Sequence, residues 1–328
     1  DFRISQENLR LMATPEGSAG RVTAELLYMK GRFPVELGFD SRPGKWLAHK
    51  GLVVDMTRDS FRIFRKRDVL LLSPEEHDFT RMRQCLTSLA AESIGLAAGL
   101  TEPVVVLING RFFGLRYDIE RIDSKFRKRV LLDKTGPLSR LNGDDHWRSS
   151  WDLRATRVGK SGDLVSVNEL VRQVNRLHPA EIEGFFRSRF YLQRFIDRLA
   201  FSAIRGELDP APADFFLLKD SRNGKWEFFR QEYRNSDWGI RDFEREIREL
   251  TPGELERALF PLCQRAGAPG RASWMVLFTR FFKVPALREL YLQRVESMLR
   301  EELSPTSFDK LADQAAARVA SSLEDWRA

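Results

Sequence analysis

Two acidic segments decide the fold of this chain. The first has the sequence GELDPAPADFFLL over residues 206–218, and the second has KWEFFRQEYRNSDWG over residues 225–239. Each joins an acidic loop to a short apolar run rich in β-forming residues, and the turn signal Asn223-Gly224 lies between them. This pattern predicts a β-hairpin that brings the acidic ends of its two strands together.

The acidic ends allow two interpretations. Carboxylate groups gathered at one edge can hold magnesium and orient a nucleotide, which is how phosphoryl-transfer sites are built. The alternative from the residues alone is a surface hairpin without chemistry, because hairpins with acidic ends are common.

The first third of the chain has the character of a β-structure. Short β-forming runs at 21–28, 51–56 and 68–72 predict strands. Pro103–Ile122 predicts a hairpin, because Asn109-Gly110 is the strongest two-residue turn signal. Between them, Ser73-Pro74-Glu75-Glu76 has the composition of a helix start, so we expect one helix from there to about Ile94, ended by Gly95.

From about Val167 the pattern becomes helical. Aromatic and aliphatic residues at helical spacing predict a helix over Glu181–Ile204, followed by the acidic hairpin. Further helices are expected at about 241–265, 272–302 with a break at Pro285, and 308–326.

This order predicts an α+β, bilobed fold of protein-kinase-like layout, with the nucleotide cleft between the lobes. The expected domains are a β-rich N-lobe with one embedded helix at 1–125, a connecting insertion at 126–166, and a mostly helical C-lobe with the acidic hairpin at 167–328.

Composition narrows the class of protein. The 328 residues are 42% apolar and 31% charged, as is ordinary for a globular chain. No apolar run approaches the roughly 20 residues that a membrane span needs, so no transmembrane segment is expected. The chain begins at Asp1 and not at Met, which is compatible with a removed leader. The two cysteines and four histidines are scattered, and no Cys or His spacing predicts a zinc site.

The net charge of +7 bears on partners. Basic residues cluster at 62–67 and 125–129, which favours an acidic or phosphate-bearing ligand or protein partner. Solvated loops that bind nothing are the alternative. No nucleic-acid module and no interleaved stacking aromatics occur, so nucleic acid is not expected as a partner.

Several motifs resemble the spore-coat CotH family of atypical protein-kinase-like proteins. The most specific is the hairpin INGRFFGLRYDIERID at 108–123, similar to the family form LNGxxxGxYxxxExID. Lys50-Gly51-Leu52, the basic stretch 65–71 and Ile94-Gly95-Leu96 are similar to other family segments in the same order. The resemblance runs from about Arg21 to Gly239 and implies the same bilobed fold.

The resemblance also implies site residues. Asp209 matches the catalytic aspartate, and Asp214 lies where the family has a metal-binding Asn. Lys50 matches the phosphate-anchoring lysine motif, and Glu120 is expected near the inter-lobe hinge, so both are candidates for binding the nucleotide. The implied cofactors are ATP and magnesium or manganese.

The chain departs from the family at two of these motifs. The run 231–234 is Gln-Glu-Tyr-Arg where the family has Trp-Asp-x-Asp. Glu232 can replace one aspartate as a metal ligand, and Asp237 lies a few residues further on and can supply another. Arg234 would repel a cation. The lysine motif is also reduced, and if the anchoring position lies later in that strand, Asp55 occupies it and repels phosphate.

Three hypotheses follow. The first is a degenerate pseudokinase that keeps the fold and acts as a binding or scaffolding module. The second is an active metal-dependent kinase that transfers phosphate from ATP to a Ser or Thr acceptor. The third is an unrelated α+β envelope protein. The resemblance implies an extracytoplasmic location, secreted or associated with the cell envelope.

Overall fold

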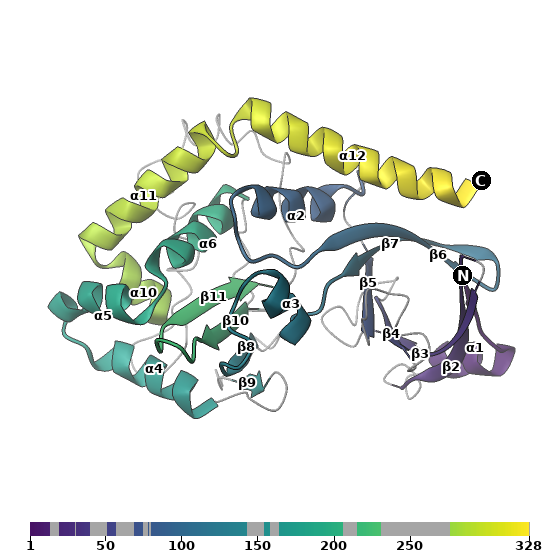
Figure 1. The fold of residues 1–328 in the computed structure, drawn as a ribbon, viewed down its shortest axis with the longest axis horizontal. Helices are drawn as coiled ribbons and strands as arrows, with labels where there is room; N and C mark the ends of the chain where they lie inside the picture. The colour runs from purple at the N-terminus through teal and green to yellow at the C-terminus, as the bar shows by residue number, and fades with distance from the viewer. Residues whose placement is uncertain are drawn as a thin grey trace. The chain divides into compact units, whose positions relative to one another are not determined.

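The computed structural model describes residues 1–13, 20–29, 31–39, 51–56, 69–74, 78, 80–142, 154–157, 164–205, 215–230 and 276–327 (Figure 1). The chain divides into two compact units. The N-terminal unit comprises 1–88, 99–121 and 311–328, and the helical unit comprises 89–98 and 122–310. Each unit is described by itself.

Seven strands of the N-terminal unit close into a barrel in the order β1-β2-β3-β4-β5-β7-β6. Neighbours are antiparallel except for β1 and β6, which meet in parallel at Phe2 and Ile108. The barrel interior is apolar, and Leu37, Leu52 and Val54 are fully buried in it. The strands are β1 (Phe2–Arg3), β2 (Val22–Tyr28), β3 (Gly31–Phe39), β4 (Leu52–Met56), β5 (Val69–Pro74), β6 (Thr101–Ile108) and β7 (Arg111–Ile119).

The β6–β7 turn confirms the prediction at Asn109-Gly110. Both residues have positive φ, 51° and 78°, as a two-residue hairpin turn of this kind requires. The Asn109 side chain also accepts a hydrogen bond from the Ile4 N–H at 2.8 Å and donates one to the Ile4 carbonyl at 2.9 Å. The turn therefore also fixes the start of the chain against the barrel.

The helix α2 begins later than the sequence predicts. It spans Arg83–Ser93, and the predicted cap Ser73-Pro74 belongs to β5, where these residues pair with Tyr117 and Arg116. The Asp78 carboxylate accepts hydrogen bonds from the amides of Met82 and Arg83, so it supplies the capping interaction. The predicted end is confirmed, because Gly95 has φ +74° directly after the helix.

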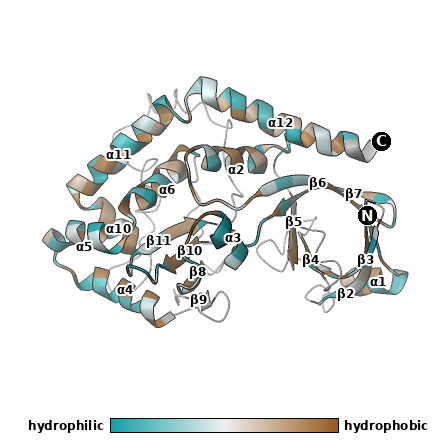
Figure 2. Ribbon diagram, in the orientation of Figure 1, coloured by the Kyte–Doolittle hydropathy of each residue, from teal (hydrophilic) through white to brown (hydrophobic). Residues whose placement is uncertain are grey.

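The helical unit contains a four-stranded sheet in the order β11-β10-β8-β9. Its strands are β8 (Leu138–Asn142), β9 (Arg154–Arg157), β10 (Phe215–Lys219) and β11 (Trp226–Arg230), all antiparallel. The predicted acidic hairpin is therefore present as β10–β11, and Figure 2 shows β10 as hydrophobic along most of its length. β8 and β9 lie in a polar segment whose weak pattern did not predict them.

Helices surround this sheet. They are α3 (Ser124–Arg129), α4 (Leu164–Arg176), a short 3-10 helix (Pro179–Glu181), α5 (Ile182–Arg189), α6 (Leu192–Ile204), α10 (Val276–Phe282) and α11 (Pro285–Arg300). α6 packs against β11 and α11. Phe195, in the first turn of α6, contacts five other phenylalanine rings with centroids within 6 Å: Phe186, Phe190, Phe228, Phe278 and Phe281.

The predicted helix over Glu181–Ile204 is wrong as one element. The chain leaves helical geometry at Phe190, which forms an isolated parallel bridge with Trp226, and the Tyr191 N–H donates to the Trp226 carbonyl at 3.1 Å. Two helices result, joined by residues that pair with the edge of β11. The break predicted at Pro285 is confirmed, since Pro285 begins α11.

The remaining helices are α1 (Gln6–Ala13) and α12 (Pro305–Arg327). The mixed α+β class, with a β-rich N-terminal part and a mostly helical C-terminal part, is confirmed. The lobe boundaries at 125 and 166 stay a prediction. Within the described ranges, no helix is both long and apolar enough to cross a membrane.

Candidate functional site

Most of the predicted site residues lie outside the described residues: Lys50, Asp209, Asp214, Glu232 and Asp237. The structure does describe the strand ends to which four of them are attached. Phe215, the first residue of β10, pairs directly with Arg230, the last residue of β11. The segments carrying Asp209 and Asp214 on one side, and Glu232 and Asp237 on the other, therefore join the sheet at the same edge.

Two buried arginines border these segments. Arg205 follows the last residue of α6, is 1% exposed, and lies over the Phe201 ring at 5.4 Å. Arg230 is also buried, and its guanidinium lies 5.2 Å from the centre of the Phe215 ring. Because arginine keeps its proton at any accessible pH, both bring fixed positive charge to this edge of the sheet.

Glu120 is the one predicted site residue within the described part. It is half-buried just after β7. Its carboxylate accepts a hydrogen bond from the Leu100 N–H at 3.0 Å, and its own N–H donates to the Leu100 carbonyl at 2.8 Å. These bonds tie the residue after β7 to the residue before β6, so Glu120 has a structural task in addition to any contact with a ligand.

The strand that follows Lys50 is part of the barrel core. β4 pairs with β3 and β5, and Asp55 near its end forms an ion pair with Arg21 at 2.7 Å. The negative charge of Asp55, which we considered an obstacle to phosphate, is therefore paired with a cation.

The opposite end of the hairpin contains a hydrogen-bonded network centred on Asp220. The carboxylate accepts from the Tyr191 hydroxyl at 2.5 Å, from the Arg222 side chain at 2.5 and 2.8 Å, and from the Arg222 N–H at 2.9 Å. Asn223 donates in turn to the Tyr191 hydroxyl at 2.8 Å. The bonds from Arg222 and Tyr191 lower the pKa of Asp220 to about 2.

Asp133 holds the same turn from the other side. Its carboxylate accepts from the Ser221 N–H and hydroxyl at 2.7 and 2.6 Å, and from the Thr135 N–H and hydroxyl, both at 2.9 Å. Burial opposes ionisation, but these hydrogen bonds outweigh it and hold the pKa of Asp133 well below its usual range. Asp133 and Asp220 therefore fix the β10–β11 turn as ionised groups.

Glu227 is a third buried acid, on β11. Arg194 of α6 donates to its carboxylate at 2.9 Å. Burial raises the pKa of Glu227 in spite of the attraction of Arg194. This acid links β11 to α6. No group of three or more Asp, Glu, His or Cys residues able to hold a metal ion occurs among the residues that the structure describes.

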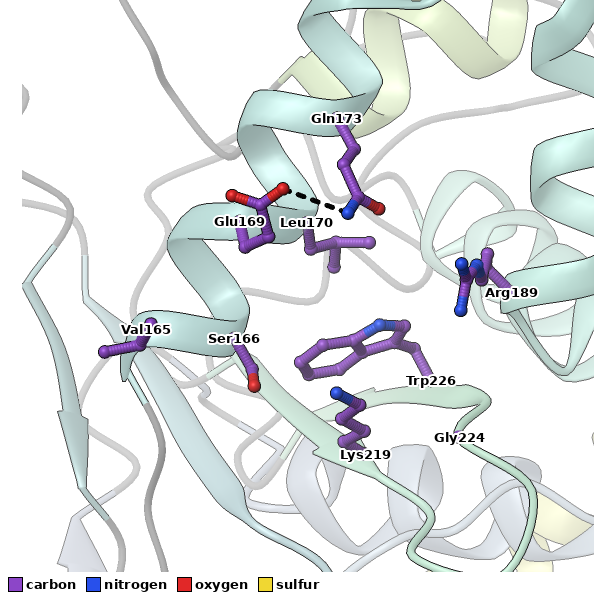
Figure 3. A pocket seen from close by; sticks show the side chains of 9 residues that line it. All are labelled: Val165, Ser166, Glu169, Leu170, Gln173, Arg189, Lys219, Gly224 and Trp226. Atoms are coloured by element: carbon purple, nitrogen blue, oxygen red, sulfur yellow. Dashed lines mark hydrogen bonds between the residues drawn. The ribbon is translucent and has the colours of Figure 1, made fainter.

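A pocket of about 190 Å³ lies between α4 and the turn end of the hairpin (Figure 3). Its lining includes Ser166, Leu170 and Gln173 of α4, Arg189 of α5, and Lys219 and Trp226 of the hairpin. Figure 3 shows the Trp226 indole between Leu170 and Lys219, and the Lys219 ammonium lies 5.7 Å from the indole centre.

Sequence reasoning missed the turn network and the pocket. The run Asp220-Ser221-Arg222-Asn223-Gly224 is rich in turn-forming residues and could have indicated a side-chain-capped turn. The partners Asp133 and Tyr191 are distant in sequence, and no local pattern identifies them.

Comparison with known proteins defines the class. Residues 50–327 match the family model described as CotH kinase protein. The chain therefore belongs to the CotH kinase family.

Two solved structures are similar in outline. A Helicobacter pylori proinflammatory kinase, CtkA, is 9% identical with a TM-score of 0.31, over 84% of this chain and 94% of that one. The Shewanella oneidensis toxin–antitoxin complex of HipA, HipB and operator DNA gives 13% identity and a TM-score of 0.28, over 99% of this chain and 72% of that one. At these values the likeness defines no site or activity. The curated proteins contain no match.

Proposed function

We propose that this chain is a degenerate CotH-family pseudokinase that acts as a binding or scaffolding module for a protein partner or an acidic or phosphate-bearing ligand. The observation that carries the proposal is the run Gln231-Glu232-Tyr233-Arg234 directly after β11, where the family has Trp-Asp-x-Asp. This change removes one carboxylate and adds a guanidinium, and a like charge weakens the binding of a divalent cation.

The chemistry of the expected donor set supports the proposal. The run 231–234 offers one carboxylate, Glu232, and one guanidinium, Arg234, where the family offers two carboxylates. The fit of this run to a magnesium–nucleotide complex is therefore poor, because divalent cations bind through oxygen ligands and are repelled by a guanidinium.

The alternative is an active metal-dependent kinase. Family membership and the retained Asp209 favour it. In that case Asp209 would orient the acceptor hydroxyl, Asp214 with Glu232 or Asp237 would hold the metal, and Lys50 would neutralise phosphate charge. ATP with magnesium or manganese would then be the cofactor set, and a Ser or Thr side chain the acceptor.

An extracytoplasmic location in the cell envelope completes the proposal. It rests on membership of the CotH family.

Thermal unfolding with millimolar ATP and manganese tests the proposed function. We expect no stabilisation for the degenerate module. A ligand at one hundred times its Kd would stabilise the fold by about 2.7 kcal/mol, which is easily measured. Such a shift, lost in Glu232→Ala, together with phosphoryl transfer lost in Asp209→Asn, would establish the kinase instead.

A restoring variant sharpens this test. Glu232→Asp combined with Arg234→Asp recreates the two aspartates of the family motif, and we expect it to gain manganese-dependent ATP binding that the natural chain lacks. Arg187→Asp on α5 changes the charge of an exposed residue to the same extent as Arg234→Asp and serves as the matched control. Equal ATP binding by the natural and restored chains would contradict the degenerate site.

A further inference from the structure

The pocket between α4 and the β10–β11 turn lies at the end of the hairpin opposite the strand ends from which the acidic segments leave. It is lined by the turn end of the hairpin, at Lys219 and Trp226. The acidic segments join the other end, at Phe215 and Arg230. Four residue steps along β10 separate the two ends by about 13 Å. The described lining of the pocket therefore contains none of the residues expected to bind the nucleotide.

Its charge is positive. Lys219 and Arg189 have no carboxylate partner among the described residues, and the contact of Lys219 is with the Trp226 ring. Among the described lining residues the one acid is Glu169, and it is already engaged, since it accepts from Arg172 at 3.1 Å and from Gln173 at 3.0 Å. Two cations without a described carboxylate partner, beside this neutralised acid, favour an anionic ligand.

The surface between these cations is apolar. The Trp226 indole and Leu170 line the pocket and are 5% and 3% exposed. Val165, 73% exposed, is a further apolar residue of the lining. A ligand that combines an anion with an apolar group would use both parts of the lining.

The hairpin side of the pocket is rigid before any ligand binds. Lys219 pairs with Trp226 across the hairpin, and its N–H donates to the Pro137 carbonyl at 3.0 Å. In the adjoining turn, Asp133 accepts two hydrogen bonds from Ser221 and Asp220 accepts three from Arg222. A preorganised surface loses little conformational entropy on binding, which favours recognition by a small contact area.

We propose that this pocket binds an acidic peptide segment of a partner protein, with a carboxylate beside Lys219 or beside Arg189, which lie on different sides of the Trp226 indole, and a neighbouring apolar side chain on Trp226. The volume of about 190 Å³ selects this ligand class. Pockets for drug-sized molecules measure roughly 300–1,000 Å³, so this one accepts one or two side chains rather than a nucleotide. The inference deepens the proposed binding role but does not depend on the state of the nucleotide site.

Titration of the full chain with a defined peptide tests the proposal. The probe is acetyl-(Leu-Glu)3-amide, with acetyl-(Leu-Gln)3-amide and inorganic phosphate as comparisons. The readout is the indole N–H resonance of Trp226, assigned by its loss in Trp226→Phe. We expect a saturable shift with the acidic peptide at a Kd of roughly 0.1–1 mM, as a small contact area implies, and little response to the other two probes.

Three variants locate the binding. Lys219→Gln and Arg189→Gln should each weaken peptide binding about three- to tenfold, as loss of a charge-assisted contact does. Arg187→Gln, an exposed residue on the same helix as Arg189 that pairs with Glu183, removes the same charge outside the lining and should leave the Kd unchanged.

Each other outcome overturns the proposal. An equal response to phosphate and to the acidic peptide would show a general anion site. An equal loss in Arg187→Gln would show non-specific attraction, and no Trp226 shift at 5 mM peptide, about five times the weakest expected Kd, would show no site. The peptide titration contains no ATP or manganese, so its failure would not count against the degenerate nucleotide site. Conversely, stabilisation by ATP and manganese in the unfolding experiment would not count against peptide binding in this pocket.

Discussion

Replacement of Asp220 by Asn tests whether the turn network stabilises the helical unit as an ionised group. Asp220→Asn keeps the shape of the side chain but removes its charge and turns one acceptor oxygen into a donor. The retained Oδ1 can still accept from the Arg222 N–H and from Arg222 Nε, whereas the new amide group, in place of Oδ2, meets the Arg222 Nη2 and Tyr191 hydroxyl donors.

The cost follows from the two lost interactions. A hydrogen bond to a charged group contributes about 1.5–3 kcal/mol, and the bond from Tyr191 lies in that range. The side chain of Arg222 is 64% exposed, so its pair with Asp220 contributes only about 0–1 kcal/mol. We therefore expect Asp220→Asn to lower the free energy of unfolding by about 2–3 kcal/mol at pH 7.

The pH dependence gives a second, independent value for the contribution of ionised Asp220 to the free energy of unfolding. The pKa of Asp220 falls from 3.8 to about 2 on folding. This difference corresponds to about 2.4 kcal/mol, reduced to about 1–2 kcal/mol by the exposure of Arg222. Because the folded pKa is lowered, the contribution is complete above about pH 4 and is lost as the pH falls through about 2. The difference in free energy of unfolding between the natural chain and Asp220→Asn should therefore narrow by about 1–2 kcal/mol as the pH falls from about 4 to about 2.

Urea unfolding between pH 7 and pH 2 measures both quantities, with hydrogen exchange of the β10–β11 peptides as a local readout. Glu183→Gln removes an exposed ion pair with Arg187 and should cost less than about 0.5 kcal/mol, so it serves as the control. The reasoning would be refuted if Asp220→Asn lowered the free energy of unfolding at pH 7 by no more than Glu183→Gln does. It would also be refuted if the difference between the natural chain and Asp220→Asn stayed constant down to pH 2.

Three further substitutions test the fold, each measured by thermal or urea unfolding. Asn109→Ala should cost about 2–3 kcal/mol, because it places Ala at positive φ and removes two hydrogen bonds that fix the start of the chain; an effect below about 1 kcal/mol would contradict this role. Phe195→Ala should cost about 3–5 kcal/mol as the centre of the phenylalanine cluster, well above half-buried Phe185→Ala; equal costs would remove Phe195 from the core. Gly136→Ala should cost about 1–3 kcal/mol, since its Cβ would lie 2.1 Å from the carbonyl oxygen that ends β10; a neutral effect would show that β10 can shift.

Local chemistry made part of the fold predictable. The turn between β6 and β7 lies at Asn109-Gly110 as predicted, because few residue pairs accept positive φ at both positions. Gly95 ended α2 for a similar reason. In these places the residues themselves determine the backbone conformation, and no distant contact competes.

Tertiary contacts decided the places where the predictions failed. Ser73-Pro74 has the composition of a helix start, but pairing with β7 keeps both residues in β5. Helical spacing continues through Phe190, yet its bridge to Trp226 breaks the helix. A one-dimensional pattern does not contain these contacts, so propensity alone gave the wrong boundary.

The candidate site also has one part that the sequence predicted and one part that it did not. The family motifs placed Asp209, Asp214 and Glu232 on the two arms of one hairpin, and the pairing of Phe215 with Arg230 agrees with that hairpin. The pocket at the other end joins side chains from three elements whose sequence positions share no pattern. It could be found only in three dimensions.

The N-terminal unit is discontinuous, and this has a consequence for synthesis on the ribosome. The unit includes residues 99–121 and again 311–328, and Ser322 of α12 donates a hydrogen bond to the Pro103 carbonyl across 219 residues of sequence. At about 5–20 residues per second, the intervening chain takes roughly 10–40 s to emerge. Throughout that interval the nascent N-terminal unit lacks residues 311–328, while residues 122–310 form a separate compact unit that can fold first. Chaperone demand should therefore be greatest late in translation, and truncations near the C-terminus should destabilise the barrel at the opposite end of the sequence.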